Sequence, residues 1–177
     1  MVVKGFEILE SEKSAQDLQS KISKPILAKI SETLSMLEKV EKTVTQLFKK
    51  MEKAAVSDEL AKCLSPVSTD VIQHLGRLKI LKKAIDIIKV DVETPLTISL
   101  VKLKKPNLNQ DLDIIAQALN LQSHKQGLYE MLHALLCADE LMFEAELIEQ
   151  TINDNRNTNI WLRQIVKNVI APQFLES

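Results

Sequence analysis

The chain has 177 residues, a mass of 20.0 kDa and a net charge of −1, with 3 glycines, 5 prolines and only 3% aromatic residues. A chain of this length can bury a core of its own, and two cysteines are too few for a disulfide-dense secreted scaffold, so the sequence predicts a cytoplasmic protein. No apolar run approaches the ~18 residues of a membrane span, so we expect no membrane-spanning helix.

Charge is distributed unevenly along the chain. Residues 1–105 hold 19 lysines and arginines against 14 acidic residues, whereas residues 106–177 hold 4 against 10. The extremes are residues 77–105, with eight basic residues, and residues 130–154, with seven acidic residues and no basic one. Unlike charges attract, so these two stretches are candidates to face each other, within one molecule or between two.

One long amphipathic helix is predicted over about residues 25–55. Pro25 suits the first helical turn, because an N–H group there would have no partner within the helix. Apolar residues then recur at spacings of three and four, close to a heptad seam, while lysine and glutamate fill the outer face. The seam consists of Ile26, Ile30, Leu34, Leu37, Val40, Val44, Leu47, Met51 and Ala54.

Two helices are predicted to follow the long one. Ser57 is a typical N-cap residue and begins a short helix, and residues 64–68 form a connector that contains a proline. Thr69 or Asp70 then caps a helix that is expected to run to Val90. Its wide apolar face is predicted to consist of Leu78, Leu81, Ala84, Ile85 and Ile88, extended by Ile80 and Ile87. The opposite arc holds Lys79, Lys82, Lys83 and Asp86.

The middle of the chain is predicted to form further short helices. Thr94, followed by a proline, can cap a helix over residues 96–105, although the alternation there could also indicate a strand without obvious partners. A compact helix is expected over residues 107–120, and Ser123 can cap the next one.

The last part of the chain is helical in its pattern, but its apolar face rotates, which predicts a break near Asp139. The polar residues 153–157 are typical of a turn. A final helix, capped by Thr158 or Asn159, is then expected to run to Pro172.

Together these patterns predict an all-α protein, an irregular bundle of six to eight helices that includes the long amphipathic helix over about residues 25–55. We expect an N-terminal arm with the long helix in residues 1–56 and a compact helical bundle in residues 57–177. One continuous domain over residues 1–177 is the alternative.

The best candidate for a metal site is a histidine, a cysteine and two glutamates at i, i+4, i+7 and i+11, which requires a helix running straight through Asp139. A di-iron bundle needs two Glu-x-x-His motifs, and only Glu130 with His133 provides one. We therefore interpret the set as a solvated helix face with one buried thiol, and expect no metal or cofactor. Its members are His133, Cys137, Glu140 and Glu144.

Nucleophilic catalysis needs a nucleophile, a base and an orienting group. Cys137 and His133 are one helical turn apart but lack a third group, Cys63 has only Lys62 beside it, and His74 is interpreted as a satisfied histidine at the edge of the core. Glycine-rich phosphate loops are absent from the sequence. We predict no enzymatic activity and keep a metal- or thiol-dependent enzyme as the second alternative.

The lysine-rich stretch of residues 77–105 is the feature best suited to phosphate contacts. It contains one arginine and no aromatic residue, whereas nucleic-acid recognition favours arginine forks and stacked aromatic rings. Nucleic acid is therefore a disfavoured partner, and a nucleic-acid-associated factor using this stretch is the first alternative.

The function that the sequence favours is a non-enzymatic helical module for protein–protein interaction: an adaptor, an assembly subunit or an effector-type domain. The partner would be another protein that docks on a helix face or a charged patch, and a homodimer is left open. The residues predicted to bind it are Arg77, Lys79, Lys82, Lys83, Lys102, Lys104, Lys105, Glu140 and Glu144.

Overall fold

The computed structural model of the chain describes residues 22–93, 96 and 107–176, and every regular element in these residues is a helix. The elements are α2 (Lys24–Ala54), α3 (Asp58–Leu64), α4 (Val71–Ile85), α5 (Leu108–Ala138), α6 (Met142–Ile165), the π-helical turn η1 (Val166–Ile170) and α7 (Ala171–Glu176). The all-α class is confirmed for this part of the chain. The predicted count is too high: the described residues form five separate helices, because η1 and α7 continue α6 without a break.

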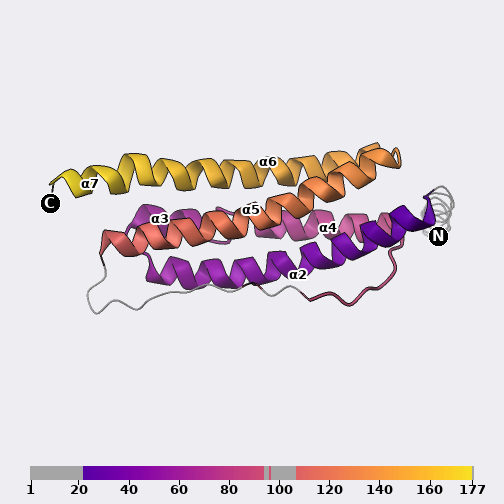
Figure 1. Cartoon of the computed structure of the whole chain (residues 1–177), viewed down its shortest axis with the longest axis horizontal. Coiled ribbons are helices and arrows are strands. Elements are labelled where there is room, and N and C mark those ends of the chain that lie inside the picture. The colour runs from indigo at the N-terminus through magenta and orange to yellow at the C-terminus, as the bar shows by residue number, and fades with distance from the viewer. Residues whose placement is uncertain (1–21, 94–95, 97–106, 177) are drawn as a thin grey trace, which may run out of the picture.

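The helices pack side by side along one long axis (Figure 1). α5 and α6 form an antiparallel pair, and α2 packs against α5. α3 and α4 lie end to end and both contact α2 and α6, so together they replace a fourth long helix. None of the helices in the described ranges is long and apolar enough to cross a membrane.

α2 confirms the predicted long helix. It has Pro25 in its first turn and buries its inner face. The buried residues of this face form one hydrophobic cluster with residues of α3, α4, α5, α6 and η1. Burial of this face supplies most of the stability of the helix, because helix propensity contributes little by comparison. The predicted division of the chain at residue 56 stays a prediction, since residues 1–21 lie outside the described ranges.

α3 begins as expected, with the Ser57 hydroxyl accepting the Leu60 N–H at 3.4 Å. α4 ends at Ile85, before the predicted end at Val90, because Asp86 adopts a left-handed conformation with φ 50°. Aspartate tolerates this conformation, which often ends helices.

α5 runs unbroken through the predicted stop at Asn120 and the predicted cap at Ser123. The Ser123 hydroxyl donates to the Leu119 carbonyl at 2.8 Å, so it bonds back within the helix and caps nothing. Asparagine and serine cost a helix interior well under about 1 kcal/mol each. Burial of Leu121 and Gln122 between neighbouring helices outweighs that cost.

α6 likewise runs through residues 153–157, where a turn was predicted. Asn155 donates its side-chain N–H to the Thr151 carbonyl at 2.9 Å, and the Thr158 hydroxyl bonds back to a carbonyl four residues earlier. Pro172, the expected end, lies inside α7. The π-helical turn η1 ends two residues before it, and the Ala171 N–H bonds to the Val166 carbonyl.

The break predicted near Asp139 is confirmed, because α5 ends at Ala138 and α6 begins at Met142. Glu140 in this turn has φ 60°, a left-handed conformation that reverses the chain direction. The helix predicted over residues 96–105 lies outside the described residues, apart from Leu96.

Candidate functional site

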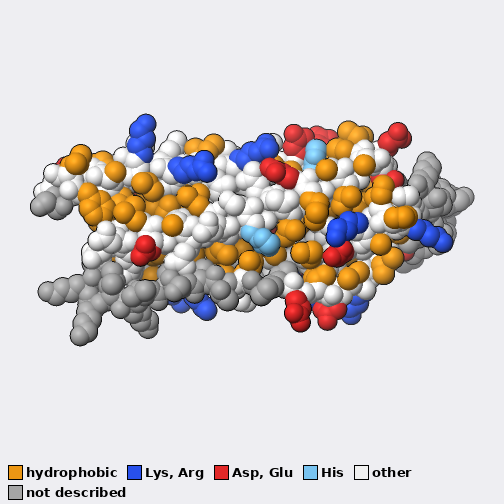
Figure 2. Space-filling view, viewed as in Figure 1, with side chains coloured by type: hydrophobic (Ala, Val, Ile, Leu, Met, Phe, Trp, Pro, Cys, Tyr) orange, Lys and Arg blue, Asp and Glu red, His pale blue; other side chains and the backbone are white. Residues whose placement is uncertain are grey.

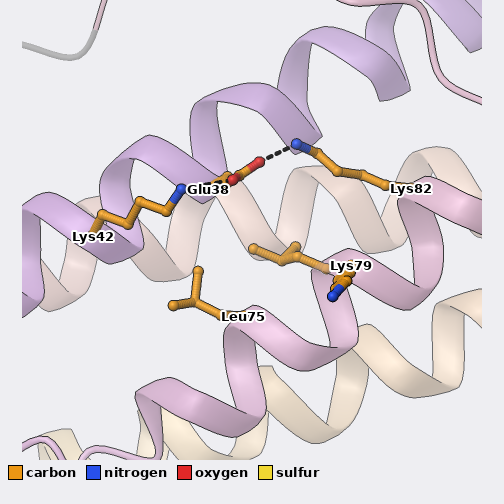
Figure 3. Close-up of a pocket in the computed structure, with 6 residues that line it drawn as sticks. Glu38, Lys42, Leu75, Lys79 and Lys82 are labelled. Carbon is orange, nitrogen blue, oxygen red and sulfur yellow. Dashed lines mark hydrogen bonds and ion pairs between the residues drawn. The ribbon is translucent and has the colours of Figure 1, made fainter.

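A groove of about 330 Å³ opens between α2 and α4 (Figure 3). Its lining residues come from one face of each helix, because the α2 residues are four apart and the α4 residues follow the spacing i, i+3, i+4, i+7. Leu75 points from α4 toward α2, and the Glu38 carboxylate lies between two lysines. The lining consists of Glu38 and Lys42 from α2 and of Leu75, Leu78, Lys79 and Lys82 from α4.

The charge at this groove is mainly positive. Glu38 accepts hydrogen bonds from Lys42 at 2.7 Å and from Lys82 on the facing helix. These bonds, first from Lys42 and then from Lys82, lower the pKa of Glu38 to about 2, so the carboxylate stays ionised and is matched by two cations. Lys79 is exposed and has no ion pair or hydrogen bond to the described residues, so its charge is available to a ligand.

The helical structure of α4 divides the predicted lysine patch. Lys79 and Lys82 line the groove, whereas Lys83 is exposed outside its lining. Arg77 points toward α6, where it donates to Asp154 at 2.6 Å. The remaining predicted residues fall into three environments: Lys102, Lys104 and Lys105 are outside the described residues, Glu140 is exposed in the α5–α6 turn, and Glu144 is 7% exposed.

A second polar cluster lies inside the bundle, centred on Glu41 of α2. One carboxylate oxygen accepts the Tyr129 hydroxyl at 2.6 Å and the His74 Nδ1–H at 3.0 Å, and the other accepts the Lys125 ammonium at 3.3 Å. The Nε2 of His74 is 3.5 Å from a carboxylate oxygen of Asp154, but no described residue forms a hydrogen bond with it. Residues from α2, α4, α5 and α6 therefore meet in one polar layer.

Glu41 is ionised although it is 1% exposed. Burial is the largest single influence and acts to raise its pKa. The Lys125 charge and the hydrogen bonds from His74 and Tyr129 together outweigh burial and lower the pKa to about 2. Burial and the Glu41 charge raise the pKa of Tyr129 well above its usual value. The cluster is thus a carboxylate held in a fixed charge state by three donors.

Acid should destabilise the protein through Glu41. Because the folded pKa is about 2 and an ordinary glutamate has a pKa of 4.5, the unfolded chain binds more protons between these values. We expect the free energy of unfolding to be constant above this range and to fall as pH is lowered from about 4.5 to about 2. Urea titrations across this range should show a shallower fall for Glu41→Gln than for the wild type, and an identical slope would contradict the assignment.

The buried cluster is closed to substrates. His74 and Glu41 are each 1% exposed and Lys125 is 3% exposed, so a ligand could reach them only if the helices separated. The cluster contains a base and a hydroxyl, yet neither meets the requirement of access to a reacting atom. Its chemistry is therefore that of a structural ion pair with supporting hydrogen bonds.

The thiol and metal candidates are placed as follows. Cys137 and His133 are in contact, with the sulfur 3.8 Å from Nε2, but the helix break separates them from Glu140 and Glu144. No group of three or more possible metal ligands occurs in the described ranges. Burial, and then the charge of a nearby glutamate, raise the pKa of the Cys63 thiol to about 12, which makes it a poor nucleophile.

Several residues of these sites were not predicted from the sequence. Leu78 was recognised only as a member of an apolar face, and Leu75 was not singled out. Glu41 carried a usable signal, because it is the single charged residue in a heptad row: Ile30, Leu34, Leu37, Glu41, Val44, Phe48 and Met51. Its donors Tyr129 and Lys125 carried none, since more than 80 residues separate them from Glu41.

No family model, curated protein or solved structure matches the chain.

Proposed function

We propose that the chain is a non-enzymatic adaptor that binds an acidic segment of another protein in the groove between α2 and α4. The observation that carries the proposal is the combination of leucines and unmatched positive charge in one groove. The partly exposed Leu75 offers apolar contact, Leu78 is 2% exposed and forms part of the groove floor, and three lysines surround a single glutamate that is already paired. An amphipathic helix laid in a groove is a common mode of protein recognition.

Charge complementarity selects the partner. A segment with aspartate or glutamate beside a large apolar side chain would place its carboxylates near Lys42 and Lys79 and its apolar group against Leu75. Such complementary charges steer association and reject partners with like charge. Nucleic acid fits less well, because neither an arginine nor an aromatic ring lines the groove.

The cytoplasmic location belongs to the same proposal. It is supported by Cys63 and Cys137, which are both free thiols, with Cys63 fully buried in the core. Free thiols are typical of reducing compartments.

Reversing the charge of Lys79 should weaken binding by about tenfold or more, because Lys79→Glu places a carboxylate beside those of the ligand. The probe is a set of peptides selected from a displayed random library on the immobilised wild-type protein. We expect the selected peptides to pair acidic residues with a large apolar residue, and their affinity, measured by fluorescence anisotropy, to fall as salt rises.

The matched control is Lys62→Glu, which reverses an exposed lysine of α3 outside the groove lining and should leave affinity within about twofold. Peptides that bind both variants equally well would place their site elsewhere. A single-stranded oligonucleotide that binds the wild type more tightly than any selected peptide, and is lost in Lys79→Glu, would replace the protein partner with nucleic acid.

A further inference from the structure

The outer face of α6 carries two blocks of opposite charge (Figure 2). Glu146 and Glu149 lie in its first half, near the α5–α6 turn, and Arg163 and Lys167 lie at its other end and in η1. All four side chains are exposed, and none has an ion pair or hydrogen bond to the described residues. The face is thus segregated by charge, and these four charges are not matched by any residue in the described ranges.

Apolar side chains stand at both ends of this charged face. Met142 and Phe143 are 62% and 65% exposed at the start of α6, and Leu175 is 90% exposed near the end of α7. Single exposed apolar residues are normal on a protein surface, but adjacent ones such as Met142 and Phe143 form the kind of contiguous patch that is typical of interaction sites. The order along this face is therefore apolar, acidic, mainly polar, basic and apolar, with Ile160 exposed just before the basic block.

This order is complementary to itself when two rods run antiparallel. With a two-fold axis near Arg156, Glu146 of one copy faces Lys167 of the other and Glu149 faces Arg163, over about 30 Å of helix. Two-fold symmetry repeats each of these pairs. It also brings Met142 at the start of each α6 to within about 7 Å, measured along the helix axis, of Leu175 in the other copy. Arg156 itself is matched by Glu130 of its own chain at 3.6 Å, so the axis does not bring unpaired like charges together.

We propose that the protein forms an antiparallel homodimer through the outer face of α6, held in register by these charge blocks and closed at each end by the apolar side chains. No residue that lines the α2–α4 groove lies on α6, so this surface and the groove belong to different helices. The dimer proposal can therefore be tested independently of the adaptor proposal.

Two charge-reversed variants test the arrangement: Glu146→Lys with Glu149→Lys, and Arg163→Glu with Lys167→Glu. Light scattering of the wild type should give twice the chain mass of 20.0 kDa, with dissociation at high salt. Each variant alone should give the single-chain mass, because its blocks then repel. An equimolar mixture should return to twice the chain mass, and native mass spectrometry should find one chain of each kind in the complex.

The four altered residues are exposed, so each variant should keep the wild-type circular dichroism spectrum and melting temperature within a few degrees. A wild type that stays at the single-chain mass overturns the proposal. So does a dimer that persists in both variants, or a mixture in which the two variants fail to combine, because either result removes the antiparallel charge pairing.

Discussion

Replacing Glu41 with alanine should lower the free energy of unfolding by about 3–5 kcal/mol, because it leaves a buried charge without its partner. Lys125 is 3% exposed, and the Glu41 carboxylate is its only hydrogen-bond acceptor among the described residues. The Tyr129 hydroxyl and the His74 Nδ1–H would also lose their acceptor. Urea denaturation monitored by circular dichroism should show a lower midpoint with an unchanged slope.

Glu38→Ala is the matched control, since Glu38 lies one turn earlier on α2 and is also bonded to two lysines. Its side chain is 33% exposed, so water can replace the lost bonds and the cost should be below about 1 kcal/mol. Equal and small effects of the two substitutions would mean that water reaches Glu41. The double variant Glu41→Leu, Lys125→Met should recover most of the lost stability, because it removes both charges together.

The polar layer around Glu41 fixes how the helices align. Sliding any one of the four helices by a turn of about 5.4 Å would leave a buried charge or donor unpaired. An apolar seam alone gives weaker discrimination between alignments, because apolar side chains repeat at every turn of α2. The contributing residues are Glu41 from α2, His74 and Arg77 from α4, Lys125 and Tyr129 from α5, and Thr151 and Asp154 from α6.

The parts of the fold that the sequence predicted correctly are those that local rules determine. The seam of α2, the Ser57 cap and the break after Ala138 each follow from spacing or turn chemistry within a few residues. Apart from the ends predicted at Val90 and Pro172, the errors in helix boundaries lie at asparagine and serine residues in α5 and α6, where local preference favours a stop. Packing on both sides of these helices decides the outcome there, and a single sequence does not reveal which faces become buried.

In the two polar sites, too, local features could be predicted from the sequence and contacts between distant helices could not. Lys79 and Lys82 were predicted as part of a charged stretch, and the Glu38–Lys42 pair follows from their i, i+4 spacing. That Lys82 also reaches Glu38, or that Arg77 turns to Asp154, depends on helices brought together from distant parts of the chain. The groove exists only through that packing, so neither its apolar floor nor its position could be derived from the stretch alone.

Val44→Asp should unfold most of the protein at ambient temperature. Val44 is 2% exposed within the seam of α2, and aspartate would place an unpaired charge in an apolar interior, at a cost of several kcal/mol. Natural domains have only about 5–15 kcal/mol of stability in total. Thermal denaturation should show a melting temperature lowered by tens of degrees or no transition. Gln46→Asp, at an exposed position two residues later, should change stability by no more than about 0.5 kcal/mol. A normal melting curve for Val44→Asp would instead place the seam of α2 on the surface, as a face for a partner.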